Sequence, residues 1–163
     1  MIDKAKAVSV SRRINAPVPS VFGILAGPAR HVELDGSGML RNAVTSNPIT
    51  RVGDVFVMKM HNSRLGDYEM NNHVVEFEPD RRIVWEPEPG RGHPRAGGGR
   101  LGHWWGFELA SDGPGATMVT ESYDCSRAPE PQREGMDNGR VWLDAMTATL
   151  EHLDRLCTGQ IGE

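Results

Sequence analysis

The stretch that decides the fold is Val8-Ser-Val-Ser-Arg-Arg-Ile-Asn-Ala-Pro-Val-Pro-Ser-Val-Phe-Gly-Ile-Leu25. Small or apolar residues alternate with polar ones over residues 7–14, as they do in a half-buried strand. Ala16 stands before a proline, a position that disfavours helical geometry. Pro19 can occupy the first turn of a helix without losing a hydrogen bond. The sequence therefore predicts a strand that leads at once into a short helix over Ser20–Ala26.

The rest of the chain predicts more strands and a closing helix. Six further alternating segments lie between turn signals, at residues 39–45, 54–62, 67–77, 83–86, 101–110 and 116–124. A second short helix is predicted over His31–Asp35, and an amphipathic helix over Met136–Cys157, where apolar residues recur every three or four positions. This order predicts an α+β fold. In it, a curved antiparallel sheet of six to seven strands wraps on a long C-terminal helix and leaves a hollow between the two layers.

Length and composition narrow the class of protein. At 163 residues the chain has the size of one domain, with an expected core at about 7–157. Its net charge of −4 argues against a nucleic-acid binder, which needs a basic surface. No apolar run approaches the ~20 residues that span a bilayer, and no secretory signal is visible. We therefore expect no membrane insertion, a cytoplasmic location, and reduced thiols at Cys125 and Cys157.

Four stretches carry a family resemblance. They are Val8–Leu25, Val52–Met58, the strand–proline–strand unit Val74–Pro79 with Arg82–Trp85, and the hairpin Trp105–Leu109 with Gly115–Val119. In this order they resemble the polyketide cyclase/dehydrase and lipid-transport family (SRPBCC) of the START-like helix-grip superfamily. The resemblance implies the helix-grip fold and a single START-like ligand-binding domain over residues 1–163. Members of the superfamily include carriers, cyclases, receptors and chaperone cofactors, so the fold does not determine the function.

Bulky apolar side chains are expected on the sheet face toward the C-terminal helix. If the same alternate residues of each strand face inward as in the family, these side chains line a pocket for a small hydrophobic ligand. Such pockets are mostly apolar, and methionine adapts to irregular ligand shapes. The predicted ligand-binding residues are Phe56, Met58, Met60, Trp85, Trp105, Phe107, Trp142 and Met146. Each of them could instead be an ordinary core residue.

Three polar residues with the same parity are candidate catalytic groups: Glu121, Tyr123 and His103. A buried carboxyl group with a raised pKa is suited to proton transfer. Alternatively, Glu121 is exposed or paired with an arginine, and Tyr123 caps the core with its hydroxyl in solvent. The alternation of its strand predicts that the His61 side chain faces outward. Which face of the sheet His73 lies on depends on whether its strand contains a bulge. No spacing of ligands indicates a metal site, and no phosphate-binding or dinucleotide motif indicates a cofactor.

The sequence leaves three functions open. The first is binding or transport of a small hydrophobic ligand, such as a lipid, a fatty acid or a polyketide-like molecule. The second is an aromatase/cyclase or dehydratase acting on a polyketide-type substrate. The third is a protein-interaction module of the chaperone-activator type, which would need a filled interior and an apolar outer patch.

The glycine- and proline-rich segment 87–100 is predicted to be a mobile loop beside the cavity opening. A monomer and a homodimer are both compatible with the sequence.

Overall fold

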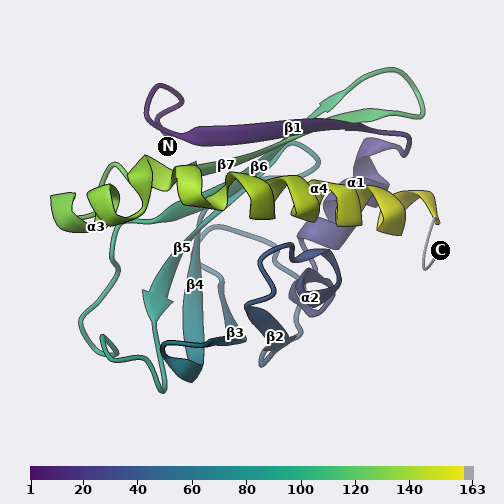
Figure 1. Ribbon diagram of the computed structural model, residues 1–163. Coiled ribbons are helices and arrows are strands. Elements are labelled where there is room, and N and C mark those ends of the chain that lie inside the picture. Colours follow the sequence, from purple (N-terminus) through teal and green to yellow (C-terminus); the bar gives the residue numbers. More distant parts are fainter. Residues whose placement is uncertain (160–163) are drawn as a thin grey trace.

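A computed structural model describes residues 1–159 and has one antiparallel sheet of seven strands, in the order β1-β7-β6-β5-β4-β3-β2 (Figure 1). The strands are β1 (Val8–Ile14), β2 (Leu40–Ala43), β3 (Val55–Asn62), β4 (Gly66–Glu78), β5 (Arg82–Pro89), β6 (Trp104–Ser111) and β7 (Thr117–Asp124). The helices are α1 (Val18–Leu25), η1 (Pro28–Arg30), α2 (His31–Leu34), α3 (Glu130–Gly135), η2 (Asp137–Trp142) and α4 (Leu143–Thr158). The predicted α+β helix-grip architecture is confirmed.

The helices cover one face of the sheet, which we call the inner face. Helix α4 runs across it, with α1 and α2 toward one end of α4 and α3 toward the other (Figure 1). Helix α4 packs against β1 and α2. Strand alternation sends Phe107, Leu109 and Val119 inward, where they are buried with Leu150 of α4. The short helices after β1 follow the prediction closely, because Pro17 and Pro28 each stand where a helix begins.

Strand β5 is longer than the predicted strand at residues 83–86. It continues to Pro89 along β4, whereas β6 pairs with β5 only from Arg82 to Trp85. Residues 86–89 thus lie at a free sheet edge, where prolines are tolerated because no partner requires their missing N–H group. The segment predicted as a loop over 87–100 therefore begins only at Gly90 and ends before Trp104.

The C-terminal helical segment is also divided differently from the prediction. The expected helix over 136–157 consists of the short helix η2 followed by α4, and the additional short helix α3 precedes both. Asn138 and Gly139 break the segment with left-handed φ angles of 52° and 96°. A Cβ atom on Gly139 would lie 2.7 Å from Cδ1 of Tyr123, so this close approach requires glycine. None of the helices within residues 1–159 is long and apolar enough to cross a membrane.

Candidate functional site

The eight predicted ligand-binding residues all lie on the helix side of the molecule but differ in burial. Four are core residues, with 1–4% of their surface exposed: Phe56, Met58, Phe107 and Met146. The other four, Met60, Trp85, Trp105 and Trp142, are only half-buried. Met70 and Pro87 are half-buried as well and share the inward parity of their strands. We call Met60, Met70, Trp85, Pro87, Trp105 and Trp142 the inner apolar surface, because solvent reaches these side chains.

Aromatic rings from several elements meet around this surface. The ring of Trp85 lies 5.9 Å from that of Phe107 and 5.3 Å from that of Phe56. The ring of Trp105 lies 4.4 Å from Tyr123 and 5.6 Å from Trp142. The tilted and edge-on arrangements are those that aromatic side chains prefer. The result is a set of flat apolar faces supplied by β3, β5, β6, β7 and η2.

His103 and Tyr123, two of the candidate catalytic residues, form a hydrogen-bonded pair. Nδ1 of His103 lies 2.5 Å from the Tyr123 hydroxyl, and Nε2 lies 3.2 Å from Oε1 of Gln132. A neutral His103 with its proton on Nε2 satisfies both contacts, because Tyr123 then donates to Nδ1 and Nε2 donates to Gln132. Burial lowers the pKa of His103 and raises the pKa of Tyr123. The alternative that places the Tyr123 hydroxyl in solvent is wrong, since this residue is 1% exposed.

Glu121 is the third candidate, and its carboxyl group is buried on the inner face. Its side chain is 5% exposed, and Oε2 has no hydrogen-bond partner among residues 1–159. Burial first, and the nearby Asp35 carboxylate second, raise the pKa of Glu121 well above its ordinary value. The alternatives of an exposed Glu121 or an arginine partner are therefore wrong for the described part of the chain. Burial and Asp35 thus favour the protonated form of Glu121, which lies two residues before Tyr123 on β7.

Two buried polar residues that sequence reasoning missed also lie on this face. Nε2 of His31 donates to the Leu25 carbonyl oxygen over 2.7 Å, and burial lowers the pKa of this imidazole. The side-chain amide of Asn72 donates to the carbonyl oxygen of Phe56 over 3.2 Å. His31 lies on a helix of only four residues, too short for a periodic pattern to show which side chains face inward.

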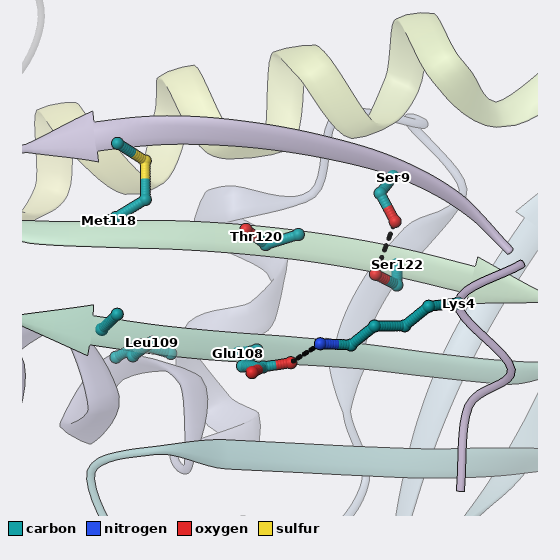
Figure 2. A pocket seen from close by; sticks show the side chains of 8 residues that line it. Lys4, Ser9, Glu108, Leu109, Met118, Thr120 and Ser122 are labelled. Atoms are coloured by element: carbon teal, nitrogen blue, oxygen red, sulfur yellow. Dashed lines mark hydrogen bonds and ion pairs between the residues drawn. The ribbon is translucent and has the colours of Figure 1, made fainter.

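The two described pockets lie on the opposite, outer face of the sheet. The larger has a volume of about 220 Å³ and lies beside Lys4, Ser9, Glu108 and Ser122 (Figure 2). The smaller, of about 130 Å³, lies beside Met1 and Ile2 where the chain crosses β5 and β6. Neither pocket is on the helix side, so the predicted cavity between sheet and helix stays a prediction. The inner apolar surface is the part of that region that solvent reaches.

The remaining strand histidines contact carboxyl groups on the outer face. His61 has the outward direction expected of it and contacts Asp67 over 2.7 Å. His73 contacts Glu88 over 2.9 Å, and the bulge in its strand falls after it, between Val74 and Glu76. Within the described range 1–159, no three histidine, cysteine or acidic side chains are placed to hold a metal ion.

Two curated proteins are similar to the chain in sequence. No family model matches it. It is 36% identical over 117 residues to the uncharacterized protein Rv0088 of Mycobacterium tuberculosis strain H37Rv, an alignment that covers 72% of this chain and 46% of that protein. A protein of the CDC 1551 strain is 35% identical over the same length. The chain thus spans about half the length of the curated relatives it matches.

Solved structures resemble the chain over nearly its whole length. Protein Ms6760 from Mycobacterium smegmatis superimposes with a TM-score of 0.68 at 13% identity, covering 98% of this chain and 96% of that one. A Polyketide_cyc-like protein from Corynebacterium glutamicum gives a TM-score of 0.51 at 19% identity, over 95% and 84% of the two chains. At such identities the likeness concerns the fold alone. The chain has the helix-grip fold, with half-buried apolar side chains and the buried carboxyl group of Glu121 on the inner face.

Proposed function

We propose that the chain binds a small hydrophobic ligand, of the lipid, fatty-acid or polyketide-like class, against the inner apolar surface. The observation that carries this proposal is the half-burial of Trp85, Trp105 and Met60 on the helix side of the sheet. Large apolar side chains that face inward are normally buried completely, and those that remain accessible to solvent often mark a binding site. The likeness to a Polyketide_cyc-like protein supports the same class of function.

The expected affinity follows from the area of contact. A ligand that covers ~200 Å² of apolar surface gains ~5 kcal/mol before the costs of ordering it. Before those costs, ~5 kcal/mol corresponds to a dissociation constant of about 0.2 mM, and polar contacts are needed to offset the costs. Binding of a naphthalene-type probe should therefore be measurable by fluorescence at sub-millimolar concentrations.

Two adjacent tryptophans provide a matched test of the binding surface. Trp105 belongs to the inner apolar surface, whereas Trp104 faces the outer side, where the guanidinium of Arg127 lies 3.9 Å from the centre of its ring. Trp105→Ala should weaken binding of a naphthalene probe by about tenfold or more, because it removes a large part of the contact area. Trp104→Ala should leave the affinity unchanged. Equal affinities for the two variants, or no binding by the wild type, would refute the proposal.

A second candidate function is catalysis on the bound ligand, in the manner of a cyclase or dehydratase. The specific observation that favours it is the hydrogen bond between His103 and Tyr123, the latter lying two residues after the buried Glu121 on β7. Such groups can donate and accept protons without contact with bulk water. Incubation with a linear poly-β-keto thioester, followed by mass spectrometry, tests this function. Turnover should decrease at least about tenfold in Tyr123→Phe, because the hydroxyl proton is lost; unchanged turnover would exclude the role.

A further inference from the structure

The carboxyl group of Glu121 has an unusual environment for a buried polar group. Directly opposite it in register are Phe107 on β6 and Val10 on β1, both apolar. Oε2 is shielded from solvent and has no hydrogen-bond partner among the described residues. A buried polar group without a partner costs free energy, and most native proteins satisfy such groups with protein, water or ligand. Glu121 is therefore a polar group with hydrogen-bonding capacity left for a ligand.

The surroundings of Glu121, which include the Asp35 carboxylate, determine whether its carboxyl group donates a hydrogen bond or only accepts one. The Asp35 carboxylate accepts bonds from the Ser37 amide and hydroxyl at 3.0 and 2.7 Å and from the Leu40 amide at 3.2 Å. Burial in apolar surroundings, and second the negative charge of Asp35, disfavour ionisation of Glu121 and raise its pKa. A neutral carboxylic acid carries an O–H group, which can donate to an oxygen atom of a ligand.

The surroundings also restrict the shape and charge of that ligand. Phe107, directly opposite Glu121, lies 5.9 Å from Trp85 of the inner apolar surface, and Trp105 lies 4.4 Å from Tyr123, the next inward residue on β7. The two half-buried rings among them, Trp85 and Trp105, are suited to stacking on another ring. An anionic group placed here would lie close to the Asp35 carboxylate and lose its own hydration.

We propose that Glu121 donates a hydrogen bond to the ligand and so selects a neutral ring compound with a keto or hydroxyl oxygen over an anion of the same shape. This proposal rests on the proposed function, because it assumes that the ligand lies on the inner apolar surface. It narrows the ligand class from lipids, fatty acids and polyketide-like molecules to uncharged, oxygen-bearing rings.

Three probes with one ring system separate the two proposals. Naphthalene tests binding to the apolar surface, 2-acetylnaphthalene adds a keto oxygen, and 2-naphthoate adds a negative charge. Binding to the full chain at pH 7 is measured by quenching of tryptophan fluorescence and by calorimetry. The wild type should bind 2-acetylnaphthalene about tenfold more tightly than naphthalene, since one hydrogen bond to a buried donor has that effect. It should bind 2-naphthoate most weakly.

Variants at Glu121 then assign the selectivity to its carboxyl group. Glu121→Met removes the donor at nearly constant length, and the keto probe and naphthalene should then bind equally well. Glu121→Gln keeps an N–H donor and should retain most of the preference. Ser122→Ala is the control on the same strand, because Ser122 faces the outer side and bonds to Ser9. Thermal melting of each variant checks that it is folded.

The outcomes distinguish failure of this inference from failure of the proposed function. Equal binding of naphthalene and 2-acetylnaphthalene to the wild type would overturn the inference and leave the proposed function intact. The inference would also be overturned, and the proposed function left intact, if Glu121→Met still bound 2-acetylnaphthalene more tightly than naphthalene. Tighter binding of 2-naphthoate would also overturn it and would indicate an anion site, for which the exposed Arg95 of the 90–103 loop is a candidate. If none of the three probes binds, both proposals are wrong.

Discussion

His31 stacks on Trp85, with the ring centroids 5.5 Å apart and 25° between the ring planes. The edge of the same imidazole meets Phe56 at 5.4 Å, and its Nε2 atom is held by the Leu25 carbonyl oxygen. One buried histidine thus connects helices α1 and α2 to the inner apolar surface. It fixes the face that Trp85 presents to a ligand.

Replacing His31 should therefore affect both stability and binding. We expect His31→Ala to lower the free energy of unfolding by about 2–3 kcal/mol, because it leaves a cavity and an unpaired carbonyl group. Urea denaturation measures the change. His61→Ala is the control: this exposed histidine pairs with Asp67 on the outer face, and its removal should change stability by less than about 0.5 kcal/mol. A similar small effect at both positions would contradict the role assigned to His31.

Buried histidines should also make the protein sensitive to acid. Burial lowers the pKa of both His31 and His103 in the folded state. The unfolded chain therefore takes up protons at a higher pH than the folded one, and stability should fall as the pH decreases below about 6.5, the ordinary histidine value. Unfolding curves between pH 7.5 and 5 test this expectation. His31→Gln should show a smaller loss over the same range.

Glu121 should produce the opposite dependence on pH. Its pKa is raised in the folded state by burial and by Asp35, so the folded protein holds this proton more tightly than the unfolded chain. The stability that results is complete below about pH 4.3 and is lost as the pH rises through the folded value, by at most about 1.4 kcal/mol per pH unit. The free energy of unfolding of Glu121→Gln, relative to that of the wild type, should accordingly increase between pH 4.5 and 8. A difference between the two proteins that stays constant over this range would contradict the effect assigned to Glu121.

Gly36 tests the contact between the α2–β2 turn and helix α4. A Cβ atom at this position would lie 2.2 Å from the Ala145 carbonyl oxygen and 2.6 Å from the Thr149 amide nitrogen, so backbone would have to move. We expect Gly36→Ala to destabilise the protein by about 3 kcal/mol. Gly23→Ala is the matched control, because it lies in helix α1 with open space around it and should stabilise by about 0.5–1 kcal/mol. Equal melting temperatures for the two variants would refute this packing.

Strand parity is the part of the molecule that the sequence predicts best. A period of two places Phe56, Met58 and Met60 on one face, and Trp105 and Phe107 on the same side of the sheet. Glu121 and Tyr123 follow from the same rule, applied to β7. These residues could be assigned to the inner face because each strand is long enough for its alternation to be clear.

Contacts between distant segments could not be predicted in this way. The pKa of Glu121 is raised by burial and also by Asp35, which lies beyond the end of a four-residue helix and far from β7 in the sequence. The extension of β5 to Pro89 depends on where β6 stops pairing, a tertiary property that overrides the usual effect of proline. By contrast, the break before α4 had a local signal in Asn138-Gly139, a dipeptide typical of turns.

The loop over residues 90–103 should combine an anchored beginning with a mobile middle. Its first residues bond to β4: the Gly90 amide donates to the Glu69 carbonyl oxygen over 2.9 Å, and the Arg91 carbonyl oxygen accepts from the Glu69 amide over 2.7 Å. Farther along, the backbone bonds made among residues 1–159 are local turn bonds, such as Gly98 to Arg95, and Gly97 and Gly99 have left-handed φ angles. Hydrogen exchange should accordingly be slow at Gly90 and fast at Gly97–Gly99. Addition of 2-acetylnaphthalene should slow exchange at His103, next to the inner apolar surface. Strong protection of Gly97–Gly99 in the free protein would show that this segment is rigid and exclude a gating role for it.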